Sequence, residues 1–157
     1  MIRQPDRTRT LSLASFIPYR LSVASNAASS LIARAYRTRF GLSVPEWRLV
    51  AILAERTRGT PQDLTKATRM DKIAVSRAAA RLEEAGLVAR ADNPGDKRSH
   101  FLSLTAEGQK LYRAIAPAAL ELETLLLEGF SAEERRQLDA LLRRIEDAAI
   151  ERMNGAG

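Results

Sequence analysis

Between residues 60 and 85 the chain carries the signals of two short helices in close succession. Thr60, Pro61 and Asp63 supply an N-cap, a first-turn proline and a first-turn acid for the first helix. Asp71 caps a second helix, which we expect over residues 72–85. Apolar residues recur along this second helix at spacings of 3, 4 and 3, namely Val75, Ala78, Leu82 and Ala85. One side of the second helix is therefore apolar, and the pair predicts a helix-turn-helix unit.

A β-hairpin is expected directly after these two helices. The stretches LVARA and FLSL resemble short strands, and DNPGDKRSH joins them through the turn formers Asn93, Pro94 and Gly95. Two short helices followed at once by a hairpin describe a winged helix-turn-helix, in which the helix over 72–85 reads DNA.

Helices are predicted on both sides of this unit. A heptad-like seam over residues 17–35 predicts a helix from Pro18 to about Phe40, which Gly41 ends. Ser43 and Glu46 form a capping box for the next helix, which ends near Arg56. After the hairpin we expect a helix over 106–128, bent by Pro117, and a last helix that Ser131 and Glu134 cap and that frays in the sequence MNGAG.

The predicted fold class is mainly α with a small β-hairpin wing, that is, an α+β winged helix-turn-helix flanked by N- and C-terminal dimerisation helices. We expect one domain over residues 1–157. Its winged helix-turn-helix lobe covers about 43–105, and the dimerisation helices cover about 12–40 and 106–152.

The residue types present argue against an enzyme or a metal protein. The chain has no cysteine, and His100 is the only histidine. No nucleophile and base, metal cage, Gly-rich phosphate loop or cluster of carboxylates is visible, so we expect neither catalysis nor a cofactor. No apolar run is long enough to span a bilayer and the start lacks a secretory signal, which favours a cytoplasmic protein without membrane contact.

Positive charge is concentrated in the first two-thirds of the chain. The net charge is +6, and residues 1–40 carry seven arginines against one aspartate. Residues 66–98 carry eight cations against five acids, whereas residues 105–157 carry seven against ten. Such a distribution favours a polyanionic partner, although a GC-rich genome would also raise the arginine content.

The predicted reader helix places its polar residues opposite its apolar side. These residues are Lys72, Ser76, Arg77 and Arg81. An arginine there could form a fork with guanine or with a phosphate, and a serine could bond to either. A solvated helix face without a DNA partner is the alternative.

The turn of the hairpin is also cationic. Lys97 and Arg98 lie near its tip, where a cation can reach the minor groove. Asp96 lies two residues before Arg98, on the same side of an extended segment, and could hold its guanidinium. An ordinary charged turn is the alternative.

The segments DKIAVSRAAARLEEAGLVAR and DNPGDKRSHFLSLTAEG resemble the MarR family of bacterial winged-helix regulators. The resemblance rests on four motifs: Leu82 to Val88, Arg90, Asp96 with Arg98, and Leu104 to Gly108. It implies major-groove contacts by Ser76, Arg77 and Arg81, minor-groove contact by Arg98, orientation of Arg98 by Asp96, and support of the wing or contact with the DNA backbone by Arg90. Small residues at Ala74, Ala79 and Ala80 leave the base preference open.

Two apolar stripes predict a homodimer, since a single small domain would struggle to cover both. Their main residues are Ile17, Leu21 and Leu31 near the N-terminus, and Leu138, Leu141 and Ile145 near the C-terminus. A two-fold dimer would place two reader helices on one face of a palindromic operator, with half-sites about 10 base pairs apart. Packing of the same helices within one chain is the alternative.

The opening segment resembles the subgroup of MarR proteins that controls aromatic-acid and hydroxycinnamate degradation, some of which respond to aryl-coenzyme A thioesters. The resemblance implies a repressor that a small aromatic or aryl-CoA effector releases from double-stranded DNA. An anionic effector could be met by Arg20, Arg34, Arg37 or Arg39. Its ring could stack on Tyr19, Tyr36 or Trp47, unless these aromatics are plain core residues. The alternative function is a winged-helix module that contacts protein or RNA without an operator.

Overall fold

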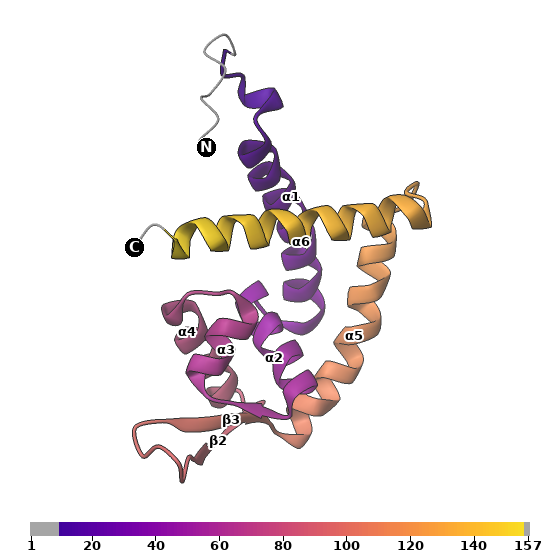
Figure 1. Ribbon diagram of the computed structural model, residues 1–157. Coiled ribbons are helices and arrows are strands. Elements are labelled where there is room, and N and C mark those ends of the chain that lie inside the picture. Colours follow the sequence, from indigo (N-terminus) through magenta and orange to yellow (C-terminus); the bar gives the residue numbers. More distant parts are fainter. Residues whose placement is uncertain (1–9, 156–157) are drawn as a thin grey trace. The chain divides into compact units, whose positions relative to one another are not determined.

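A computed structural model describes residues 10–155 of the chain (Figure 1). The chain forms two compact units, one ending at Ala119 and the other beginning at Leu120. The elements are η1 (Leu13–Ser15), α1 (Ile17–Phe40), α2 (Val44–Arg56), β1 (Arg58–Gly59), α3 (Pro61–Thr68), α4 (Lys72–Glu84), β2 (Val88–Asp92), β3 (His100–Leu104), α5 (Ala106–Leu126) and α6 (Ala132–Asn154). The predicted order of four helices, a hairpin and two helices is confirmed.

The helix boundaries follow the predicted caps. The Ser43 backbone N–H donates to Glu46 Oε2 over 3.1 Å, and the Glu46 N–H donates back to Ser43 Oγ over 3.4 Å. Matching capping boxes begin α3 and α6, and the carboxylate of Asp71 accepts from the third residue of α4 over 2.8 Å. Gly41 ends α1 with a left-handed φ of 68°. These bonds satisfy backbone N–H groups that a helix start leaves without partners.

Three details differ from the sequence prediction. Arg58 and Gly59 form a short strand that was not predicted. Helix α5 has Pro117 inside it, as expected, but ends at Leu126, slightly before the expected end, and α6 continues to Asn154, beyond the point where fraying was expected.

The sheet is antiparallel with the order β1-β3-β2. β2 and β3 form the predicted hairpin, with Val88 opposite Leu104 and Asp92 opposite His100. Gly59 of β1 pairs with Leu102 on the other side of β3. β1 therefore ties the segment before α3 to the base of the wing.

A closed core holds the lobe around α4 together. Leu53 of α2, Leu64 of α3, Leu82 of α4 and Leu102 of β3 are each at most 1% exposed. Burying four leucines at this level stabilises the lobe by roughly 1.5–3 kcal/mol per side chain. The position of α4 and of the wing is thus fixed by the same core.

The start of α5 is fastened to the turn between α4 and β2. The Thr105 hydroxyl donates to the Gly86 carbonyl over 2.7 Å and accepts from the Gly108 N–H over 3.1 Å. A Cβ on Gly108 would collide with the Leu87 carbonyl oxygen, so this position requires glycine. The motif from Leu104 to Gly108 therefore has a structural role behind the wing.

The long helices α1 and α6 bury far fewer of their apolar side chains than the lobe does. Only Tyr36 of α1 is buried, and α6 has no buried residue among those that the structure describes. Large apolar side chains that are more than a third exposed include Ile17, Leu31, Leu138, Leu141 and Ile145. Across the described residues 10–155, no helix is apolar over a length that would cross a membrane.

Candidate nucleic-acid interface

Helix α4 has one buried side and one polar, exposed side. Val75, Ala78 and Leu82 are buried in the lobe. The four residues of α4 expected to contact DNA are all exposed: Lys72, Ser76, Arg77 and Arg81. The helix thus presents a hydroxyl and three cations to solvent on a rigid element, as a groove-reading helix requires.

Arg81 has a partner within the lobe that was not predicted. Its Nε lies 2.9 Å from Glu46 Oε1, so the two side chains form an ion pair. The Arg81 side chain is 73% exposed, whereas that of Glu46 is only 8% exposed. The ion pair therefore joins a buried carboxylate of α2 to a guanidinium that stays largely in solvent, where it can meet another acceptor.

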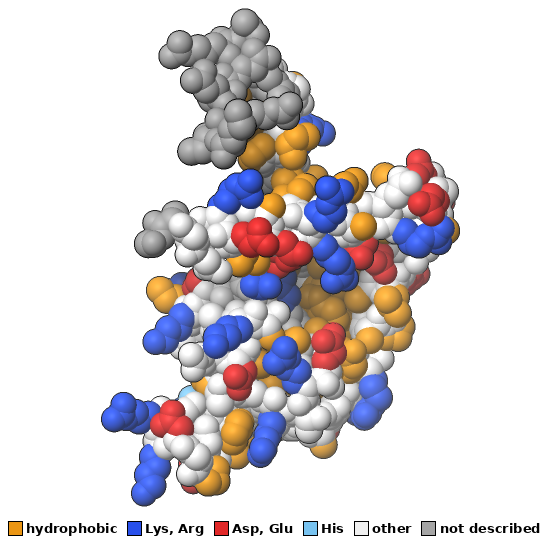
Figure 2. Space-filling model, viewed as in Figure 1, with side chains coloured by type: hydrophobic (Ala, Val, Ile, Leu, Met, Phe, Trp, Pro, Cys, Tyr) orange, Lys and Arg blue, Asp and Glu red, His pale blue; other side chains and the backbone are white. Residues whose placement is uncertain are grey.

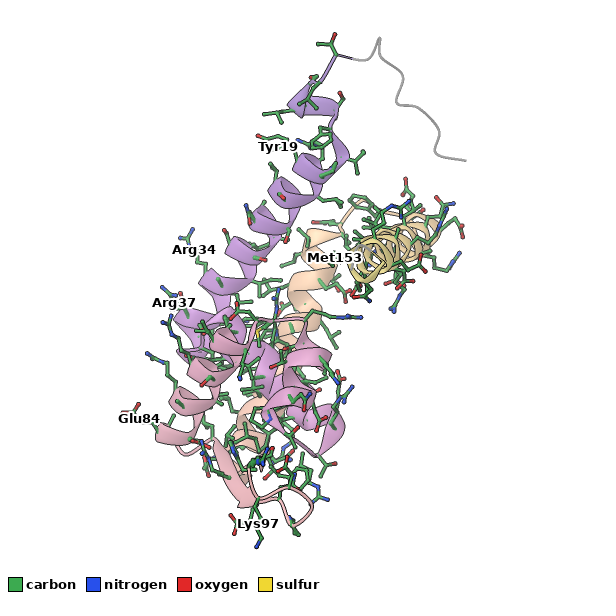
Figure 3. All side chains as sticks on the ribbon, turned by 60° about the vertical axis from the view of Figure 1, so that its left-hand side comes forward. Tyr19, Arg34, Arg37, Glu84, Lys97 and Met153 are labelled. Atoms are coloured by element: carbon green, nitrogen blue, oxygen red, sulfur yellow. The ribbon has the colours of Figure 1, made fainter. Side chains whose placement is uncertain are left out.

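The wing carries its cations at the end of the hairpin. Figure 3 shows Lys97 at the tip of the connection between β2 and β3, and blue side chains gather at this end in Figure 2. Arg98 is exposed beside it. These two residues form a cationic projection of the kind expected to approach a DNA groove.

Asp96 orders the wing through the backbone. Its carboxylate accepts a hydrogen bond from the Arg98 backbone N–H over 2.9 Å, in place of the contact with the Arg98 guanidinium that the sequence suggested. The Asn93 side chain accepts from the Gly95 N–H over 3.1 Å in the same turn. Short side chains of this type bond the amide two residues on, and this local geometry favours the backbone contact.

Arg90 of β2 forms an ion pair with Glu83 of α4. Its Nε and one Nη donate to the two carboxylate oxygens of Glu83 over 2.9 and 3.1 Å. This hydrogen bonding raises the pKa of Arg90 above its already high ordinary value. The pair ties β2 to α4, which places Arg90 as a support for the wing.

A hollow lies between α3, α4 and the wing. Lys72 and Arg98 both line it, together with the helix α3 residues Gln62 and Thr65. His100, half-buried at the start of β3, lies on its edge. Gln62, which is exposed, and Thr65, which is half-buried, were not predicted, although polar residues in the first turns after the Thr60 cap are a signal for this place.

The chain resembles known regulators over most of its length. The model of the MarR family matches residues 40–99. The homoprotocatechuate degradative operon repressor of Escherichia coli is 34% identical over 104 residues, which cover 66% of this chain and 70% of that protein. The chain belongs to the MarR family.

Two solved structures show that the similarity of this MarR protein to known regulators extends beyond residues 40–99 to the flanking helices. The MarR family transcriptional regulator Sco3205 from Streptomyces coelicolor, solved in complex with DNA, gives a TM-score of 0.81 at 27% identity and covers 91% of this chain and 92% of its own. NadR, solved in complex with 4-hydroxyphenylacetate, gives a TM-score of 0.71 at 31% identity and covers 87% and 96%. As a MarR family member the protein is a DNA-binding transcriptional regulator and not an enzyme.

Aromatic residues from α1, α2 and α5 of this MarR protein form a cluster. The rings of Tyr36 and Trp47 are tilted with centroids 5.0 Å apart, and the ring of Tyr112 stacks on Trp47 at 6.5 Å. Tyr36 is 2% exposed, and burial raises the pKa of its hydroxyl. Tyr112 of α5 was not predicted, because nothing in the sequence near it marks its approach to Trp47.

Tyr19 and Arg20, the other expected effector residues, do not join this cluster within one chain. Both are exposed in the first turns of α1. Tyr36 lies 17 residues after Tyr19 on the same helix, a separation of about 25 Å at 1.5 Å per residue. The four predicted residues therefore form two groups, at opposite ends of α1.

Proposed function

We propose that the protein is a homodimeric repressor that binds a palindromic operator in double-stranded DNA. The observation that carries the proposal is the exposed cationic side of α4 next to a cationic wing, both fixed on one closed core. In the relative Sco3205 the same fold is bound to DNA. The E. coli relative is named a repressor, which favours repression over activation.

Each interface residue then has a role. Ser76, Arg77 and Arg81 contact base edges or phosphates of the major groove. Lys72 sits at the start of the same helix, in the hollow that Arg98 also lines, and contacts the backbone. Lys97 and Arg98 approach the minor groove, while the two remaining residues, Asp96 and Arg90, hold the wing in shape.

The dimer supplies the second half of the interface. Exposed apolar side chains on α1 and α6 cost free energy in water, and a second copy would cover them. The residues assigned to this contact are Ile17, Leu21, Leu31, Leu138, Leu141 and Ile145. A two-fold axis between two lobes gives half-sites about one helical turn, roughly 10 base pairs, apart.

An aromatic acid is the proposed effector. Tyr36, Trp47 and Tyr112 offer ring faces close to the lobe, and NadR is bound to 4-hydroxyphenylacetate. Tyr19 and Arg20 could complete such a site only from a second copy, since they lie about 25 Å along α1 from Tyr36. A ligand that binds the DNA-free state more tightly lowers operator affinity by that difference and no more.

Binding to the promoter DNA of the neighbouring genes, measured as a function of salt, tests the proposal. A DNA-binding repressor should bind one palindrome with a steep loss of affinity as salt rises, and should bind its scrambled version far less tightly. Arg77→Ala should weaken the operator complex, whereas Arg113→Ala, an exposed arginine of α5, should not. Equal binding to operator and scrambled duplex would favour the alternative, a protein- or RNA-contacting module.

The effector is tested separately with the only tryptophan of the chain, Trp47. Titration with 4-hydroxyphenylacetate, with benzoate and with an aryl-CoA thioester should change Trp47 fluorescence and release the operator over the same concentration range. Aliphatic acids of equal charge serve as the control. A fluorescence change without release would separate the binding of a ligand from its regulatory effect.

A further inference from the structure

Glu46 is the one polar or charged residue that the structure describes as buried. Its residue exposure is 6%, and both carboxylate oxygens are used. Oε2 accepts a hydrogen bond from the Ser43 N–H at the start of α2, and Oε1 forms the ion pair with Nε of Arg81. A buried carboxylate is costly without such partners, so the contact with Arg81 compensates part of the burial of Glu46.

The two ends of this ion pair lie in different surroundings. Glu46 is fixed by the α2 cap and the lobe core, whereas Arg81 is mostly exposed on the proposed reading side of α4. A long arginine side chain otherwise samples many rotamers, and ordering it on DNA costs binding free energy. An anchored Nε reduces that cost and directs the rest of the guanidinium.

A second ion pair of the lobe, between Arg90 and Glu83, offers a comparison. Arg90 gives both Nε and one Nη to Glu83, so its paired edge is saturated. Arg81 pairs with Glu46 at a distance of 2.9 Å and keeps 73% of its side chain exposed, so its guanidinium is held at one point and can still meet an acceptor such as guanine O6 or N7. The same carboxylate lines a cleft with the cations Arg37, Arg77 and Arg81 and is its only acid.

We propose that Glu46 is a positioning residue for DNA recognition, which orients the Arg81 guanidinium on α4 and so contributes to the preference for the operator over other DNA. The inference rests on the proposed function, since it assumes that Arg81 contacts the operator. Glu46 also places a negative charge beside three cations, which weakens attraction to DNA of any sequence.

The experiment measures the ratio of operator to scrambled-DNA affinity for Glu46→Gln, Arg81→Gln and the double variant. Glutamine keeps an acceptor for the Ser43 N–H, so α2 retains its cap and the protein should fold. We expect Glu46→Gln to lower the ratio by about tenfold without weakening binding to scrambled DNA. In the Arg81→Gln background, Glu46→Gln should not lower this ratio further, because the arginine that Glu46 orients is gone.

Glu84→Gln is the matched control, since Glu84 is an exposed acid at the end of the same helix α4 (Figure 3). It removes one negative charge and should leave the ratio unchanged. Glu46→Asp is the second variant: it keeps the charge but withdraws the carboxylate by one methylene, and should also lower the ratio. Thermal unfolding of each variant shows the folded fraction.

The outcomes separate the inference from the proposed function. A wild-type protein that does not prefer any operator would overturn the proposed function itself. A wild-type protein that prefers its operator, with Glu46→Gln showing the same ratio, would overturn only the role of Glu46. A parallel loss of affinity for both DNAs with a lower Tm would assign Glu46 to the stability of α2 alone and would also overturn it.

Discussion

The lobe around α4 and the long helices α1 and α6 solve the burial of apolar residues in opposite ways. In the lobe, α2, α3, α4 and β3 each contribute a leucine that is at most 1% exposed. Helix α1 buries only Tyr36, and α6 buries none of its described residues. Leu31 and Leu141 are 43% and 51% exposed.

This difference has a physical meaning for a regulator. A lobe with its own core can keep its shape whether or not DNA is bound, so its surface can be specialised for recognition. Helices with exposed apolar stripes depend on a second surface, and their packing can respond to a partner or a ligand. Stability should therefore reside in the lobe, and assembly in the helices.

The largest expected effect is the loss of the dimer when the apolar seam of α1 is disrupted. Leu31→Glu in each copy places a charge without a partner in the apolar seam of α1 and should cost about 3–5 kcal/mol of dimer stability. Sedimentation of the variant should show a monomer. Asn26→Glu adds the same charge five positions earlier, on the opposite face of the helix, and should remain dimeric. A Leu31→Glu protein that sediments as a dimer would remove this seam from the interface.

A core substitution tests the lobe in the same terms. Leu82→Ala removes a side chain that is 1% exposed and should lower the free energy of unfolding by about 2–5 kcal/mol. Its loss in Tm should be similar at every protein concentration, because the cavity lies within one lobe. Ile73→Ala, in the same helix but 64% exposed, should change stability by no more than about 0.5 kcal/mol. A loss that disappeared at high concentration would contradict the closed core.

The comparison also explains which features could be predicted from sequence. The capping boxes join residues three positions apart, so their signals are local and the helix starts were predicted well. β1 was missed because its two residues show no alternation and pair with Leu102 and Ser103, far along the chain. The helix periodicity placed Val75, Ala78 and Leu82 on the buried side of α4 for the same local reason, but Ala85, expected on that side, lies just past the end of the helix and is exposed.

Contacts at the site were harder to predict than the elements that carry it. Glu46 was interpreted only as part of a cap, whereas its partner Arg81 is 35 residues later. Tyr112 of α5 stacks on Trp47 of α2, which lies far earlier in the sequence. Asp96 accepts from the backbone N–H of Arg98 and not from the Arg98 side chain. Such choices depend on tertiary packing and on which of several possible donors lies nearest.

A surface residue of the wing should affect recognition and leave stability alone. Arg98→Ala should weaken operator binding by about 1–3 kcal/mol, with the dimer and the Tm unchanged. Electrophoretic mobility shifts at two salt concentrations measure the loss. Lys110→Ala removes an exposed cation of α5 and is the matched control. Unchanged operator affinity in Arg98→Ala would remove the wing from the interface.

The smallest effect concerns a helix cap within the lobe. The Thr60 hydroxyl and backbone N–H donate to Asp63 over 2.8 and 3.0 Å, and these bonds hold the pKa of Asp63 below its ordinary 3.8. The folded state therefore binds protons less readily than the unfolded state. The stabilisation is complete above the ordinary pKa and is lost as the pH falls through the lower, folded value.

Asp63→Asn should accordingly lower the free energy of unfolding by only about 0.5 kcal/mol at neutral pH, because the exposed carboxylate is screened by solvent. Its asparagine keeps an acceptor for the Thr60 N–H, and what it loses is the charge at the start of α3. Urea unfolding at a series of pH values should show the two proteins converging as the pH falls towards about 3. Glu55→Gln, which removes an exposed acid of α2, controls for overall charge. A gap between wild type and Asp63→Asn that stays constant down to that pH would show that the charge of Asp63 adds nothing to the cap.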